Sequence, residues 1–305
     1  MRRLPATLLA LSMIASAAAH AEERDTLGFG IILTNDVYGD GSERQRTGAL
    51  QTSYIWGSAW QSSVPAQFGN ILEMRVGLES RSPDYLQRPA DDGRRYAGST
   101  THCAHTHFQH GAVEMAQGAD LVFTGSDTGL VKLPQVVHEI CGDPKPSEAT
   151  LDHQSGNDMH PAFVFGVGPN LHWGESYPPR SFAEESTGSE TLVQAGFDHT
   201  FGRLGIGRLQ GRDTATGHRY RNIDNSAEEG VSFLLGAAVA QVANSIYVPE
   251  RRGLDLTGSR DRIRAGVHWQ GDAASAFFGM TWPGPEFESP SEEQITGSVR
   301  VNFRF

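Results

Sequence analysis

Apolar and polar residues alternate with a period of two along most of the chain beyond residue 25. In the last such segment Val299 and Val301 lie on one face of an extended chain. Ser298 and Arg300 lie on the other face, because successive strand residues point to opposite sides. The same alternation predicts twelve strands, at residues 26–36, 47–57, 67–80, 96–108, 112–124, 161–173, 190–201, 203–213, 231–243, 262–270, 273–282 and 294–305. Polar segments between them read as loops, at residues 42–46, 82–94, 144–160, 177–189, 214–229, 251–261 and 283–293.

Many of these strands have about 10 residues or more, near the ~9–11 residues that a tilted membrane-crossing strand needs. A soluble sheet with one solvated face would alternate in the same way, so the pattern alone leaves both possibilities open. The ends of the chain favour the membrane. Residues 1–21 have the form of a secretory signal peptide, with two arginines, an apolar run and a small-x-small cleavage site, and the chain ends on the aromatic Phe305. We therefore predict an all-β chain that forms a single closed antiparallel transmembrane β-barrel of about twelve strands over residues 22–305.

One segment shows helical spacing instead. Apolar side chains at positions 130, 133, 137, 140 and 141 follow a period near 3.6, between capping residues at 126–128 and Gly142. Pro134 suits the first turn of a helix that starts near residue 133. The pattern predicts a turn followed by a short helix from about 130 to 141. His138 falls a little off the apolar stripe and could face a cleft, although an isolated histidine there is more often an inert surface residue.

Composition narrows the function classes. Loss of the two leader arginines would take the formal net charge from −11 to about −13, which argues against non-specific binding of nucleic acid. No low-complexity linker or internal repeat divides the chain, which favours one domain. The two cysteines, Cys103 and Cys141, could pair in an oxidising compartment, but their spacing does not decide whether they do.

The first predicted hairpin carries a group of polar side chains at one end. Asn35 and Asp36 close its first strand, and Thr47 and Gly48 open its second. Adjacent strand residues point to opposite faces, so Asn35 and Asp36 share a site only where the strand ends or bulges. Asn-Asp is also ordinary turn chemistry, so the pair by itself is compatible with either a functional site or a structural turn.

Other candidate motifs give weaker evidence of function. Cys103, His105 and His107 lie on one strand face, with His102 and His110 nearby, but the row lacks a spaced partner group for zinc, and a lumen-facing polar row explains it as well. The chain has no Gly-x-Ser-x-Gly elbow, which disfavours a serine hydrolase of that type. The glycine-rich tract at 202–207 lacks a βαβ context and does not predict a dinucleotide site.

Five tracts together resemble the outer-membrane lipid A 3'-O-deacylases, over nearly the whole of residues 22–305. They are the Asn35-Asp36 strand end with Thr47-Gly48, the sequence Arg95-Tyr96-Ala97-Gly98, the segment 125–142 with His138, the tract Leu151-Asp152-His153-Gln154 with Asn157-Asp158, and the end Phe303-Arg304-Phe305. The resemblance implies a twelve-stranded barrel with its active site between the barrel wall and a short helix. It also implies an ester hydrolase of the outer membrane that removes 3'-linked acyl chains from lipid A.

The resemblance implies roles for individual residues as well. His138 would activate water, and its side chain suits that task because the ordinary pKa of histidine, about 6.5, lies near neutral pH. Asn35 and Asp36 offer hard oxygen atoms that suit Ca²⁺ better than zinc, and Thr47 would position the substrate or complete the oxyanion donors. Gln135 and Gln154 are expected to bind substrate. The implied partners are lipid A or lipopolysaccharide, outer-membrane lipids and the barrel-assembly machinery.

Three positions depart from the family pattern: Pro134 replaces a common glutamine, Leu151 replaces the usual tryptophan, and Pro144 stands where some members have a carboxylate. The alternative function is a catalytically inactive outer-membrane barrel, either a channel or a structural protein. A channel needs a clear lumen lined by charge. The enzyme needs His138 close to Asn35, Asp36 and Thr47.

Overall fold

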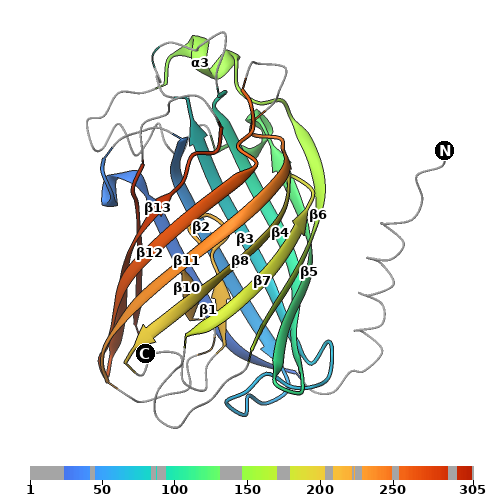
Figure 1. Cartoon of the computed structure of the whole chain (residues 1–305), viewed down its shortest axis with the longest axis vertical. Helices are drawn as coiled ribbons and strands as arrows, with labels where there is room; N and C mark the ends of the chain where they lie inside the picture. Colours follow the sequence, from blue (N-terminus) through green and yellow to red (C-terminus); the bar gives the residue numbers. More distant parts are fainter. Residues whose placement is uncertain are drawn as a thin grey trace, which may run out of the picture.

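The computed structural model is a closed barrel of twelve antiparallel strands (Figure 1). It describes residues 24–41, 45–83, 87, 94–130, 146–169, 179–202, 209–221, 223, 229–248, 254–287 and 294–303. The barrel strands are β1 (Asp25–Asn35), β2 (Gln45–Gly57), β3 (Ile71–Ser82), β4 (Ala97–His110), β5 (Val113–Thr124), β6 (Asp158–Pro169), β7 (Arg180–Thr187), β8 (Glu190–Phe201), β11 (Gly230–Ser245), β12 (Ser259–Gln270), β13 (Ala274–Pro283) and β14 (Thr296–Phe303). The first and last strands pair with each other, with Leu33 opposite Val299, so the sheet has no open edge.

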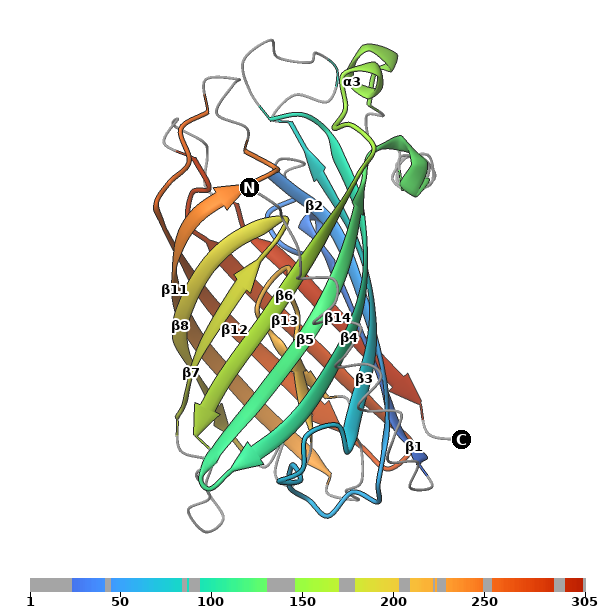
Figure 2. The same cartoon turned by 90° about the vertical axis from the view of Figure 1, so that its right-hand side faces the viewer.

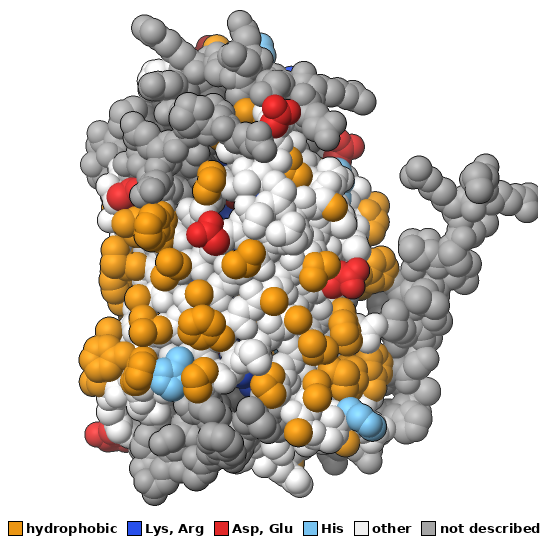
Figure 3. Space-filling model, viewed as in Figure 1, with side chains coloured by type: hydrophobic (Ala, Val, Ile, Leu, Met, Phe, Trp, Pro, Cys, Tyr) orange, Lys and Arg blue, Asp and Glu red, His pale blue; other side chains and the backbone are white. Residues whose placement is uncertain are grey.

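The two faces of the wall differ as the alternating sequence predicts. On β14 the side chain of Val301 is 56% exposed, whereas Ser298 and Arg300 are buried inside the barrel. Large apolar side chains lie over much of the outer wall, with a few acidic residues and histidines among them (Figure 3). Lipid can hold an apolar outer face while strand pairing satisfies the backbone, so this surface is that of a transmembrane barrel. Among the described residues, no helix has the length and apolar character that crossing a membrane requires.

The strands run between two ends that differ in what they carry (Figure 2). We call the end where β1 finishes at Asn35 the rim, and the opposite end, where the chain enters β1 and leaves β14, the base. The rim holds most of the longer connections, including those between β3 and β4, between β5 and β6, and between β11 and β12. It also carries the helix α3 (Glu148–Asp152), which begins where the Ser147 hydroxyl accepts the Thr150 N–H at 3.1 Å.

A small hairpin lies inside the barrel. Its strands β9 (Gln210–Arg212) and β10 (Arg219–Arg221) lie between β8 and β11 in the sequence and pair with each other inside the lumen (Figure 1). The Asp213 carboxylate accepts the Thr216 N–H at 2.8 Å and so fixes the turn between them. Tyr220 packs against Ile32 and Phe277, and its hydroxyl accepts a hydrogen bond from Gln51 Nε2 at 2.7 Å. The hairpin therefore occupies the lumen.

Two of the predictions about the wall are wrong, and their errors cancel in the count of strands. Two other predicted loops also hold regular structure, since residues 214–229 include β10 and residues 144–160 include α3 and the start of β6. The predicted strand 203–213 is not part of the wall: within its described residues only Gln210–Arg212 is a strand, and it belongs to the interior hairpin. The predicted loop 177–189 instead contains the wall strand β7. The outer face of β7 carries Ser181, Ala183 and Glu185, so it lacks the large apolar side chains that mark most of the other strands.

Several other predictions fall outside the described residues. The leader at 1–21 does, and so does the predicted helix from 130 to 141 except for Leu130, which is buried. Cys103 is a buried free thiol, while Cys141 is not among the described residues.

Candidate functional site at the barrel rim

Asn35 is the last residue of β1 and the residue that turns the chain away from the wall. The short 3-10 helix Asp36–Tyr38 begins directly after it. The Asn35 side-chain carbonyl oxygen accepts the Val37 N–H at 2.9 Å, and its amide nitrogen donates to the Thr47 carbonyl oxygen at 2.8 Å. Both ends of the side chain are therefore held, one by the turn and the other by β2. The sequence allowed Asn35 and Asp36 to share a site only if the strand ended or bulged there. In the structure the strand ends at Asn35.

Asp36 lies beside Asn35 and is 1% exposed. One of its carboxylate oxygens, Oδ1, accepts the same Val37 N–H, at 2.8 Å. Its backbone carbonyl accepts the N–H groups of Gly39 and Gly41 at 2.7 and 3.0 Å, which tightens the turn. Because the Asn35 and Asp36 oxygens both reach one N–H, these two hard oxygen atoms converge on the same point.

Thr47 lies opposite this turn, at an irregularity in β2. The register between β2 and β3 shifts between Arg46 and Gly48, so Thr47 is the extra residue of a bulge. Its hydroxyl donates to the Ser80 carbonyl oxygen at 3.1 Å and accepts from the Ser82 hydroxyl at 3.4 Å. The bulge thus places the Thr47 carbonyl against Asn35 while its hydroxyl contacts β3.

Asn35, Asp36 and Thr47 form a polar group at the upper edge of the lipid-facing wall. Along β1, Phe29 and Leu33 point outward and are 51% and 40% exposed, and Asn35 continues their alternation. Val37 and Tyr38, in the turn after Asn35, are also exposed apolar side chains. A polar group that includes a buried carboxylate is therefore adjacent to surface that would contact acyl chains.

Tyr96 and Gly98 join this part of the rim to α3. The Tyr96 hydroxyl hydrogen bonds the Ser80 hydroxyl at 2.8 Å, and its backbone carbonyl accepts the Ser155 N–H at 2.9 Å. Gly98 leaves room for Leu130, since an added Cβ would lie 3.1 Å from the Leu130 Cβ. Within the sequence Arg95-Tyr96-Ala97-Gly98, the tyrosine and glycine therefore make contacts that hold Ser155 and Leu130 against the wall.

An ion network lies in the lumen just inside the rim. Arg81 contacts Glu79 at 2.8 Å and Glu286 at 3.4 Å, and Arg94 pairs with the same Glu286 carboxylate. Burial alone would raise the pKa of Glu286, but the charges of Arg94 and Arg81 outweigh it and hold that pKa well below its ordinary value. A cavity of about 170 Å³ lies in the lumen next to this network, lined in part by Arg46, Glu79 and Glu190.

The structure brings some of the predicted site residues together. Asn35 contacts Thr47 directly and Asp36 follows Asn35, as described above. Gln154 lies just after α3, one residue before the Ser155–Tyr96 hydrogen bond. His138 and Gln135 lie outside the described residues.

Sequence reasoning missed Ser80, Ser82 and Tyr96 as neighbours of the group. Their contacts depend on the pairing register of β2 with β3, which only the folded structure gives.

This arrangement has a clear chemical capacity. Two oxygen atoms that converge from an amide and a carboxylate are ligands that Ca²⁺ accepts, and Thr47 supplies a hydroxyl a short distance away along the rim. A hydroxyl and a cation are the kinds of group that stabilise the oxyanion formed when water attacks an ester. Among the described residues of this group, none is a general base of the histidine type.

Comparison with known proteins gives a fold and no family assignment. No family model and no curated protein matches the chain. LpxR from Salmonella typhimurium superposes with a TM-score of 0.72 at 14% identity, over 91% of this chain and 100% of that chain. The CymD monoaromatic hydrocarbon channel reaches a TM-score of 0.39 at 12% identity, covering 97% of this chain and 93% of that chain. The chain therefore has an LpxR-like barrel fold.

Proposed function

We propose that this barrel is a calcium-assisted ester hydrolase of the outer membrane that removes 3'-linked acyl chains from lipid A. LpxR, a lipid A 3'-O-deacylase, has the same fold over its full length. Identity of 14% supports the fold alone, so the proposal rests on the residues at the rim. The observation that carries it is the position of Asn35, Asp36 and Thr47 at the upper edge of the lipid-facing wall.

That position suits a lipid substrate. An outer-leaflet lipid keeps its acyl chains beside the wall and its sugar and phosphate groups above it. The ester bonds between the two parts would then lie at the level of the rim, beside exposed Leu33 and Val37. A reaction centre inside the lumen would require the acyl chains to leave the bilayer. A centre at the outer edge of the rim does not.

The donor set fits the implied cation. Asp36 supplies a buried carboxylate and Asn35 an amide oxygen, and both oxygens reach the Val37 N–H within 2.9 Å. When bound there, Ca²⁺ would polarise the acyl carbonyl as a Lewis acid. The β2 bulge keeps Asn35 in place through the Thr47 carbonyl, and the Thr47 hydroxyl could turn from Ser80 toward the ester. His138 would take the proton from water, with Gln135 and Gln154 holding the substrate sugars.

The alternative of a channel has less support. The interior hairpin and the ion network of Arg81, Arg94 and Glu286 both occupy the described lumen. A channel needs a clear lumen, and the hairpin and the ion network fill part of it. The filled lumen instead suits a rigid support for a site on the rim.

Hydrolysis of lipid A by the purified barrel in detergent tests the proposal. We expect a calcium chelator to abolish release of 3'-linked fatty acid and added Ca²⁺ to restore it. Asp36→Asn should require more Ca²⁺ for the same rate, because the amide that replaces the carboxylate has no charge.

Asp40→Asn is the matched control. Asp40 belongs to the same turn, and its carboxylate accepts the Ile295 N–H at 2.9 Å rather than the Val37 N–H. The Asp40→Asn variant should need the same calcium concentration as the parent protein. Full activity in excess chelator would remove calcium from the mechanism, and no release under any condition would remove the proposed activity.

A further inference from the structure

A group of three metal-binding side chains lies on the inner wall, away from the rim. Cys103 and His105 are two positions apart on β4, so their side chains lie on the same face of the strand. Asp120 lies opposite Cys103 on β5. One potential ligand atom of each residue lies within 4.8 Å of the other two, and all three side chains are buried. We propose that Cys103, His105 and Asp120 form a zinc-binding site.

The sequence row Cys103-x-His105-x-His107 lacked a partner group, and the fold supplies it. Strand pairing brings Asp120 beside this row, although seventeen positions separate it from Cys103 in the chain. His107 is not the third ligand, because its ring contacts the Glu73 carboxylate at 2.6 Å. The site therefore combines two residues of one strand with one residue of the next.

The local packing orients the histidine toward the group. His105 lies opposite Gly118, and an added Cβ at Gly118 would lie 2.0 Å from the His105 ring. The ring therefore occupies the space that the glycine leaves. In this position His105 Nε2 lies 2.7 Å from Asp120 Oδ1.

The distances are compatible with a bound ion. Ligand atoms of a tetrahedral zinc site lie roughly 3.3–3.8 Å apart, from metal–ligand distances of about 2.0–2.3 Å. The hydrogen-bonded His105 and Asp120 atoms would separate by less than about 1 Å to reach that spacing. Zinc would replace the proton that they now share.

The donor types select the metal. A thiolate and an imidazole favour zinc over calcium and magnesium, and the Asp120 carboxylate is also a common zinc ligand. The thiolate and carboxylate together balance the charge of the ion. The nearby cation Arg75 is already paired, with two contacts of 2.8 Å to Glu73.

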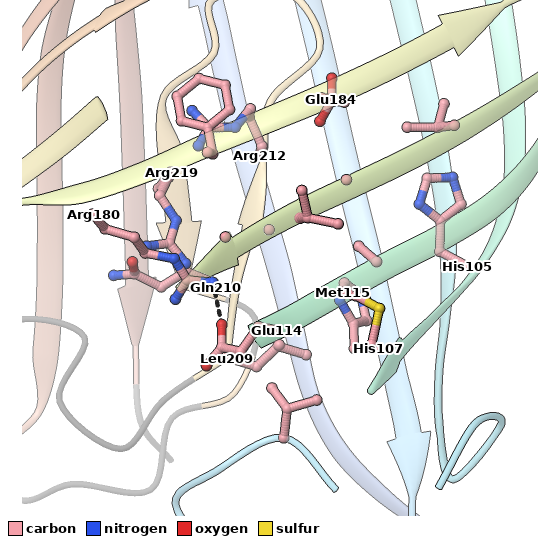
Figure 4. A pocket seen from close by; sticks show the side chains of 18 of the residues that line it. His105, His107, Glu114, Met115, Arg180, Glu184, Leu209, Gln210, Arg212 and Arg219 are labelled. Carbon is pink, nitrogen blue, oxygen red and sulfur yellow. Dashed lines mark hydrogen bonds and ion pairs between the residues drawn. The ribbon is translucent and has the colours of Figure 1, made fainter. Parts of the chain in front are cut away.

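The fourth position of the ion would face the lumen. His105 borders two hollows of the lumen: a pocket near the base, and the cavity below the rim that Asp120 also lines. Figure 4 draws the pocket near the base, and the His105 side chain lies on the side of it that β4 and β5 form. Three protein ligands and one water molecule give the coordination of an exchangeable zinc site.

Binding of Zn²⁺ and Co²⁺ to the purified, folded barrel tests this site. In a Cys141→Ser background, which leaves Cys103 as the sole thiol, we expect one equivalent of zinc by competition with a chromophoric chelator. Cobalt should give a thiolate charge-transfer absorption together with tetrahedral d–d bands. Cys103→Ser should lose the charge-transfer absorption, and Asp120→Asn should weaken zinc binding by more than about 10-fold.

His107→Gln is the matched control, because His107 is also a buried histidine of β4 with a carboxylate partner. It should bind zinc as tightly as the background protein. Heat-modifiable migration on gels verifies that each variant is a folded barrel before its affinity is measured. Absence of stoichiometric zinc in the folded background protein would overturn the proposal. Cys103, His105 and Asp120 would then be a buried cluster held by the His105–Asp120 hydrogen bond. Equal losses in His107→Gln and Asp120→Asn would also overturn it.

Discussion

The hydroxyl of Tyr220 is one of the buried groups that anchor the interior hairpin to the wall. This hydroxyl accepts a hydrogen bond from Gln51 Nε2 at 2.7 Å and also hydrogen bonds the Ser53 hydroxyl. All three side chains are buried against the inner wall. Tyr220→Phe removes the oxygen and keeps the ring that packs on Ile32 and Phe277.

The expected cost follows from what remains after the change. Gln51 Nε2 keeps a second contact, to the Arg212 carbonyl at 3.2 Å, whereas the buried Ser53 hydroxyl loses its Tyr220 partner. A buried polar group left unsatisfied costs about 1–3 kcal/mol. We therefore expect Tyr220→Phe to lower the free energy of unfolding by about that amount.

Tyr54→Phe is the reference for this measurement. Tyr54 belongs to the same strand as Gln51 and Ser53 but is 44% exposed on the outer wall, where its hydroxyl contacts Thr26. Exposed substitutions usually change stability by less than about 0.5 kcal/mol. Urea unfolding of both variants in phospholipid vesicles, followed by tryptophan fluorescence, gives the two free energies. Equal values would refute the inference that the hairpin is anchored through Tyr220.

The remaining predictions concern the wall and the rim. Val267→Arg places a charge on the lipid-facing side of β12 and should cost about 2–4 kcal/mol in the same unfolding assay if this position lies near the bilayer midplane. Gly118→Ala pushes a methyl group into the His105 ring and should cost about 1–3 kcal/mol, which the same assay measures. Because Glu286 has a lowered folded pKa, its contribution to stability is present above its ordinary value of 4.5 and is lost as pH falls through the folded pKa. Unfolding measured against pH should therefore show a smaller acid-induced loss in Glu286→Gln than in the parent protein.

The wall could be predicted from sequence because the alternation of apolar and polar residues along each strand shows which side chains share a face. Alternation on β14 correctly put Val301 and Arg300 on opposite faces, and the structure places Val301 outside and Arg300 inside. The strand β7 escaped detection because its outer face carries Ser181, Ala183 and Glu185. The interior hairpin was mistaken for a wall strand because a short strand enclosed by protein alternates in the same way as one facing lipid.

Sites that depend on register could not be predicted in the same way. The group of Asn35, Asp36 and Thr47 could be predicted from sequence because one hairpin supplies all three residues. The pairing of Cys103 with Asp120 required the register of β4 against β5, which hydropathy does not specify. The sequence thus indicates which residues carry chemistry, and the register determines which of them meet.

Mass spectrometry of lipid A from cells that express this protein tests the central claim most directly. We expect lipid A without its 3'-linked acyl chains in cells with the parent protein and intact lipid A in cells with His138→Ala. A general base contributes about 10²–10⁴-fold to rate, so the variant should show little product at equal amounts of folded barrel. Intact lipid A with the folded parent protein, or equal deacylation by His138→Ala, would contradict the proposal.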